Sequence, residues 1–222
     1  MDKLEENQRS ALLFTVVFTV IILVASVWIT RVISPSVTQA NMMYWLIDRS
    51  AGLISYELLS LSMILGLSMS SGLWDRFGRR NFAKQLHHFS TLLILPFLAL
   101  HLIGLLGDAS IPFTIANLLI PGSATYQPFL TALGSLSLYA VIALIASTYL
   151  RQRIGQKTWR TLHFLAFPTF LFVTIHGLWL GTDSHSLIGI LLYVVPLAII
   201  AGLVMERIDR AKSKQKAKTT AA

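Results

Sequence analysis

The histidines are the residues best suited to chemistry in this sequence, because four of the six form two similarly spaced pairs. His87 and His101 are 14 residues apart, and His163 and His176 are 13 residues apart. All four lie within or at the ends of long apolar runs, where an imidazole without a partner is costly. One such histidine is often only a hydrogen-bonded structural residue, but two matched pairs indicate a shared ligand.

The spacings place the two members of each pair at different depths along a helix. Fourteen residues rise about 21 Å and fall about 40° short of four turns, so His87 and His101 share a face. The 13 residues from His163 to His176 rise about 19.5 Å but leave a phase difference near 140°. Pro168 lies between them and has no backbone N–H to donate, so we expect a kink and irregular winding there.

The elements that must position these residues are six apolar segments. The chain has 222 residues, of which 55% are hydrophobic and 13% charged, and its mean hydropathy is +0.67. A helix needs about 20 mostly apolar residues to cross a bilayer. Six runs of about that length are present, at 11–30, 50–70, 87–106, 129–150, 162–180 and 186–205. We therefore predict an all-α integral membrane protein with six transmembrane helices and membrane lipid as its solvent.

The basic residues predict how these helices are oriented. Segments 1–10, 71–86, 151–161 and 206–222 hold sixteen of the 18 Lys and Arg residues. The positive-inside rule then places both termini in the cytoplasm, and this distribution also argues against nucleic acid as the reason for the net charge of +8. We divide the chain into a cytoplasmic N-terminus (1–10), a membrane domain (11–205) and a basic cytoplasmic tail (206–222), which we expect to be disordered.

This topology predicts which histidines meet. The third and fifth spans run in the same direction, so His87 matches His163 near the inner face and His101 matches His176 near the outer face. Two opposed imidazoles suit the axial positions of a planar haem. Cysteine is absent, which excludes covalent c-type haem and cysteine-bound iron–sulfur clusters. We expect two stacked b-type haems between the third and fifth spans.

His88 and Arg49 each have alternative assignments from sequence. His88 lies 100° around the helix from His87 and is the rival ligand, because its spacing to His101 is also 13 residues. Arg49, at the outer end of the second span, could pair with the propionates of the outer haem or with an anionic acceptor. The alternatives for Arg49 are a side chain reaching the lipid headgroups or an ion pair with Asp48.

Three further features concern the interior of the spans and one loop. Glu57 lies deep within the second span, where it could relay protons or make a structural hydrogen bond. Gly104 and Gly177 lie beside ligand turns, where a missing side chain admits either a macrocycle or a neighbouring helix. In loop 107–127 we expect a short interfacial helix starting near Pro112.

Segments 86–101 and 159–177 resemble the haem-binding helices of the ferric-reductase-like transmembrane domain family. The resemblance covers about residues 44–203 and includes the sequence RSAGL at 49–53 and GTDS at 181–184. The family comprises ferric reductases, the membrane half of NADPH oxidases and the haem subunit of the bacterial periplasmic methionine sulfoxide reductase system. The resemblance implies electron transfer across a bacterial plasma membrane, from a cytosolic donor through two b haems to an acceptor outside.

The electron donor is expected to be a separate molecule. In the family, flavin and nicotinamide domains usually supply the electrons, but segment 206–222 is too short for them and no G-x-G-x-x-G fingerprint is present. The chain would then be the haem-bearing membrane subunit of an oxidoreductase, served by a cytosolic flavoprotein or another donor. Two alternatives stay open: a quinol-oxidising cytochrome b-like protein, and a proton channel or transporter whose histidines relay protons without haem.

Overall fold

The computed structural model describes residues 3–33 and 36–220, which form helices and turns and no strand. The long helices are α1 (Lys3–Ile33), α2 (Val37–Ser70), α4 (Arg80–Gly107), α6 (Pro128–Tyr149), α9 (Ala166–Leu180) and α10 (Leu187–Thr220). The shorter ones are α3 (Leu73–Arg76), α5 (Ile115–Leu119), α7 (Arg151–Ile154), α8 (Gln156–His163) and the 3₁₀ helix η1 (Thr182–His185).

Six segments within the described residues are long and apolar enough to cross a membrane, which confirms the six predicted spans. They are Ser10–Ile29, Val37–Ser70, Arg80–Gly107, Pro128–Tyr149, Gln156–Leu180 and Leu187–Ser213. Helix α2 begins well before the apolar run predicted at 50–70. Its N-terminus is capped by Ser36, whose hydroxyl accepts a hydrogen bond from the backbone N–H of Gln39 at 3.2 Å. The added turns carry Asp48 and Arg49 on the same helix as the core of the span.

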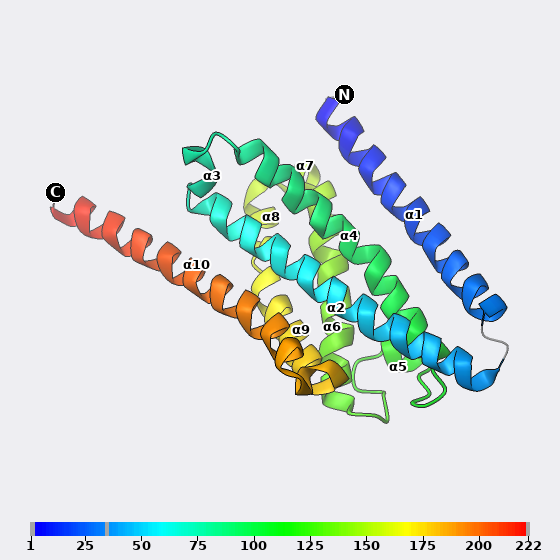
Figure 1. Cartoon of the computed structure of the whole chain (residues 1–222). Helices are drawn as coiled ribbons and strands as arrows, with labels where there is room; N and C mark the ends of the chain where they lie inside the picture. The colour runs from blue at the N-terminus through cyan, green and yellow to red at the C-terminus, as the bar shows by residue number, and fades with distance from the viewer. Residues whose placement is uncertain (1–2, 34–35, 221–222) are drawn as a thin grey trace.

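The two ends of the bundle are distinct (Figure 1). The start of α1, the end of α10, and the short helices α3 and α7 lie toward one end, which we call the inner end. Helix α5 and η1 lie toward the opposite, outer end. This arrangement follows from six consecutive spans joined by short connections. Residues 1–2 and 221–222 of the predicted cytoplasmic ends lie outside the described residues.

Helix α1 is peripheral to the rest of the bundle (Figure 1). It packs against α4, yet only 6% of its apolar window is buried within the protein. Large apolar side chains such as Phe14, Ile21 and Trp28 are exposed on it. Such a surface is expected of a helix whose neighbours are lipid chains, because lipid is as apolar as these side chains. The functional core is therefore built by the remaining five spans.

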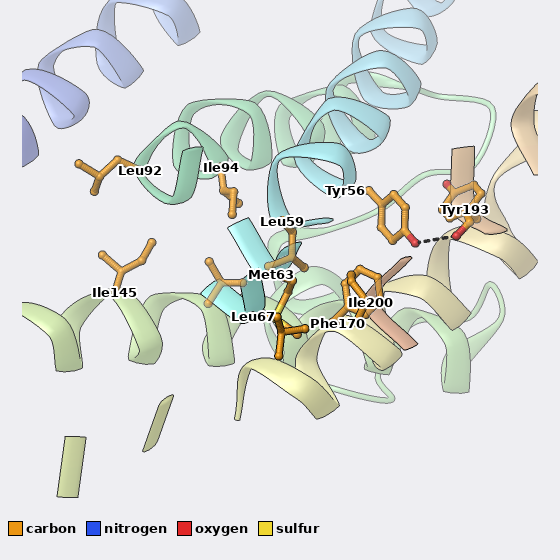
Figure 2. Packing of buried hydrophobic residues seen from close by; sticks show 11 residues of the cluster. Tyr56, Leu59, Met63, Leu67, Leu92, Ile94, Ile145, Phe170, Tyr193 and Ile200 are labelled. Carbon is orange, nitrogen blue, oxygen red and sulfur yellow. Dashed lines mark hydrogen bonds between the residues drawn. The ribbon is translucent and has the colours of Figure 1, made fainter. Parts of the chain in front are cut away.

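A buried cluster ties three of these spans together (Figure 2). The ring of Tyr56 on α2 lies 4.6 Å from that of Tyr193 on α10 and 5.7 Å from that of Phe170 on α9, between ring centroids. The Tyr56 hydroxyl donates a hydrogen bond to the Tyr193 carbonyl at 3.3 Å, and it accepts one from Thr174 at the same distance. These contacts fix α9 relative to α2, and α2 packs along α4.

The fifth span is interrupted, as its sequence predicts. It consists of α8 and α9, separated at Phe164 and Leu165. The N–H of Leu165 donates to the Leu162 carbonyl at 2.9 Å, and that of Phe167 donates to the Phe164 carbonyl at 3.2 Å. Such i to i+3 bonds wind the chain by about 120° per residue instead of 100°, which reduces the phase difference across the span. Pro168 lies in the first turn of α9, where a missing N–H is tolerated.

Two other segments differ in detail from the sequence prediction. In place of a disordered tail at 206–222, α10 continues to Thr220. The segment is rich in Ala, Lys and Arg, which are strong helix formers. Glu206 also pairs with Arg210 one turn away. The short helix in loop 107–127 begins at Ile115 and is capped by Thr114, so Pro112 precedes it by three residues.

Candidate functional site

The structure brings the four paired histidines together as two opposed couples. His87 on α4 faces His163, the last residue of α8, with ring centroids 6.3 Å apart and ring planes at 74°. His101, further along α4, faces His176 on α9 with centroids 6.4 Å apart and planes at 86°. We call these the inner pair and the outer pair. They are the couples expected from residue depth and helix direction.

The distance within each pair suits a shared metal ion. An imidazole nitrogen binds a first-row metal at about 2.0–2.1 Å and lies roughly 1.1 Å from its ring centroid, so two imidazoles on opposite sides of one metal have centroids about 6.3 Å apart. Both observed distances agree. The described residues contain no group of three or more His, Asp or Glu side chains able to hold a metal ion. Two ligands suffice only where the rest of the coordination is supplied, as a porphyrin does with four nitrogens.

Hydrogen bonds at the remote ring nitrogens orient two of the imidazoles. His87 Nδ1 lies 2.9 Å from the carbonyl oxygen of Ser62 and 3.0 Å from its hydroxyl. His176 Nδ1 lies 2.8 Å from the carbonyl oxygen of Leu130. A carbonyl only accepts, so Nδ1 carries the proton and Nε2 keeps its lone pair. This is the usual arrangement for a histidine that binds a metal through Nε2.

The third imidazole has an acidic partner. His101 Nδ1 lies 2.6 Å from the carboxylate Oδ1 of Asp48 and 3.1 Å from the carbonyl oxygen of the same residue. The backbones of α2 and α4 approach closely at this point, because a Cβ at Gly104 would lie 2.6 Å from both Cβ and N of Asp48. Gly104 therefore serves helix packing, which is one of its two sequence interpretations. Gly177 likewise packs against the ring of Tyr193.

The fourth imidazole is oriented by stacking. Trp159 lies parallel to His163, with ring centroids 5.0 Å apart and planes at 23°. His163 Nδ1 is buried and has no hydrogen-bond partner among the described residues. The guanidinium of Arg151 covers the indole at 4.6 Å from its centroid, and the indole N–H donates to the Thr148 hydroxyl at 3.4 Å. Packing on the indole thus takes the place of the hydrogen bond that the other three imidazoles make.

Glycines on neighbouring helices lie against three of the four rings, a feature that the sequence analysis missed. A Cβ at Gly52 would lie 3.0 Å from the ring of His101, and one at Gly66 would lie 3.6 Å from that of His87. Both glycines are on α2 and are 14 residues apart, the same spacing as the two histidines. The equal 14-residue spacings in two consecutive spans are the sequence feature from which these glycine–histidine contacts could have been predicted. On α6, a Cβ at Gly134 would lie 2.7 Å from Cε1 of His176.

His88, the rival ligand, faces a different helix. Its Nε2 lies 3.4 Å from the hydroxyl of Tyr149 on α6, and the two ring centroids are 6.1 Å apart. His87, one residue earlier, is the one that faces His163. This is the 100° separation expected of consecutive helical residues.

A cavity of about 250 Å³ opens beside the outer pair. Cavities of about 150 Å³ in protein interiors already hold benzene, so this space is far larger than a packing defect. Its walls are mostly apolar, with polar groups contributed by several helices. The polar lining includes His101, His176, Asp48, Arg49, Asp183 and Tyr193.

Arg49 lines this cavity but is already paired. Its guanidinium donates to both carboxylate oxygens of Asp183 in η1, with Nε 3.0 Å from Oδ2, and it stacks over the ring of Trp45 at 3.8 Å. The sequence analysis did not predict this ion pair with Asp183, and the alternative partner Asp48 pairs with His101 instead.

Glu57, the acidic residue deep within the second span, has a buried Oε1 without a hydrogen-bond partner among the described residues.

The chain matches no protein family model, no curated protein and no solved structure.

Proposed function

We propose that this chain is a transmembrane electron-transfer subunit that binds two b-type haems, one at the inner pair and one at the outer pair. The observation that carries the proposal is that both pairs have the spacing of two imidazoles on one metal, at two depths of the same two spans. The resemblance of segments 86–101 and 159–177 to the ferric-reductase-like family supports the same function. A bound haem supplies reversible one-electron chemistry at its iron.

The protein would hold each haem with two histidine ligands, with glycines that leave space beside the rings, and with apolar walls that exclude water. His87, His101 and His176 would offer Nε2 lone pairs, because their Nδ1 atoms contact other groups, and His163 would complete the inner pair. Fixed Nδ1 partners raise the basicity of these three ligands and hold their rings in place. The glycines beside the rings keep side chains out of the ligand positions. The apolar walls of the outer cavity exclude water from the ligand bonds.

The charge distribution supports one direction of electron transfer. We place the inner end in the cytoplasm of a bacterium, because sixteen of the 18 Lys and Arg residues flank the spans on that side. Electrons would then pass from a cytosolic donor, such as a separate flavoprotein, to the inner pair, and from the outer pair to an acceptor outside the plasma membrane.

A proton relay without haem fits the contacts less well. His176 directs Nδ1 at a backbone carbonyl, which has no proton to pass on. The facing centroids, more than 6 Å apart, also leave room for a metal between the rings. No specific contact favours quinol as donor over a flavoprotein, and reduction of the purified protein by each donor separates these two possibilities.

The test is removal of one pair at a time. In purified His101→Ala/His176→Ala protein we expect one haem per chain and an intact inner-haem spectrum. His87→Ala/His163→Ala should retain only the outer haem. His88→Ala is the matched control, because this ring contacts Tyr149 and should leave both haems in place. If neither double variant loses haem, the ligand assignment is wrong.

A further inference from the structure

The two histidine pairs differ in one charged contact. Around the inner pair, the Nδ1 partner of His87 is the neutral carbonyl and hydroxyl of Ser62. Around the outer pair, His176 also has a neutral carbonyl partner, but His101 Nδ1 lies 2.6 Å from the Asp48 carboxylate. Only about a fifth of either side chain in this ion pair is exposed, so solvent screens it weakly.

Two features of the local structure place Asp48 beside His101 and leave its carboxylate without another charged partner. Gly104 lies one turn beyond His101 on α4, and its missing side chain lets the backbone of Asp48 approach. Arg49, the next residue, cannot neutralise the carboxylate of Asp48, because consecutive helical residues point about 100° apart. Its guanidinium is instead held by both carboxylate oxygens of Asp183.

We propose that Asp48 is a positioning residue that sets the redox balance of the outer site through His101. The Nδ1–H of His101 donates to the Asp48 carbonyl, and the carboxylate 2.6 Å away polarises this N–H through its negative charge, which makes Nε2 a stronger electron donor. A stronger donor stabilises ferric iron more than ferrous iron. The reduction potential of the outer haem would therefore be lower than it would be with a neutral partner on His101. One electron reduces the iron from Fe(III) to Fe(II), and no proton changes place.

This inference rests on the proposed function, and its test separates the two. The variant is Asp48→Asn, which keeps the shape and a hydrogen-bond acceptor but removes the charge. In full-length protein with both haems bound, we expect the ratio of reduced to oxidised outer haem at a fixed ambient potential to rise roughly tenfold. The inner haem should titrate unchanged. Optical redox titration resolves the two, with His87→Ala/His163→Ala protein as the reference for the outer haem alone.

The matched control is Asp75→Asn, which removes an exposed carboxylate that pairs with Arg80 at the inner end of the bundle. It should leave the titration of the outer haem unchanged. Gly104→Ala adds a side chain that would displace Asp48. It should change the ratio of reduced to oxidised outer haem in the same direction as Asp48→Asn. Selective loss of the outer haem from Asp48→Asn would overturn the inference, because the carboxylate would then be required for haem retention and not for the redox balance.

Two results overturn the inference while the proposed function stands. One is an unchanged outer-haem titration in Asp48→Asn protein that keeps both haems. The other is an equal shift in Asp75→Asn, which would indicate a long-range effect of charge. Purified wild-type protein without haem would instead overturn the proposed function itself.

Discussion

Gly134 of α6 lies directly against the imidazole of His176, so closely that a Cβ at this glycine would be 2.7 Å from Cε1. A ring held this way cannot turn aside without a neighbouring helix moving. The same relation, less tight, holds between Gly52 and His101. The positions of the rings are therefore set by helix packing as well as by hydrogen bonds, and this has consequences that can be measured.

Enlarging Gly134 should disturb the outer site alone. We expect Gly134→Leu to displace His176 and to lower the haem content from two to about one per chain. Gly202→Leu is the matched control, because a Cβ at this glycine of α10 meets nothing within 4 Å. The measurement is the ratio of haem to protein after purification. Two haems per chain in Gly134→Leu would show that the outer site tolerates a displaced ring.

Removing Trp159 should loosen the inner site. The indole is the main contact that orients His163, whose Nδ1 has no hydrogen-bond partner in the described part of the chain. Trp159→Ala should therefore retain the inner haem about tenfold less tightly, whereas Trp159→Phe should retain it nearly as well as the wild type. Trp179→Ala serves as the control, because this indole is 67% exposed. Equal retention in Trp159→Ala would show that stacking does not position the ligand.

The ion pair between Arg49 and Asp183 should stabilise the outer end by about 1 kcal/mol, since it is bidentate and largely shielded from solvent. It joins residues on α2 and η1. A double-mutant cycle with Arg49→Leu and Asp183→Asn should give a coupling energy of that size in detergent unfolding measurements. Additive effects of the two substitutions would show that the contact contributes nothing to stability.

Removing the hydroxyl of Tyr56 should destabilise the core without removing haem. It donates to the Tyr193 carbonyl and accepts from Thr174, and Tyr56 is almost fully buried. We expect Tyr56→Phe to cost about 1 kcal/mol in the free energy of unfolding, with both haems retained. Loss of the outer haem in this variant would mean that the position of α9 depends on this bond.

The sequence predicted the elements of this protein well because membrane spans have a strong signature. Length and hydropathy alone locate all six segments, since a bilayer requires about 20 apolar residues in each. The couples of histidines followed from spacing and helix direction. The break between α8 and α9 was expected from Pro168, but its position at Phe164 and Leu165 depends on hydrogen bonds that the sequence does not reveal.

Contacts between distant residues could not be predicted in the same way. Asp48 and Arg49 are neighbours in sequence and invite an ion pair, yet on a helix they point in different directions and find separate partners. The partner of Arg49 lies 134 residues away. Helix packing also decides whether a glycine meets a ring, as Gly134 does, or another helix, as Gly104 does.

The most direct test of the central claim is a reduced-minus-oxidised absorbance spectrum of the purified protein, combined with haem quantitation. If each couple of facing imidazoles binds a haem, the protein will be coloured, will show the bands of low-spin b-type haem and will contain two haems per chain. A colourless protein after expression with ample haem would contradict the account.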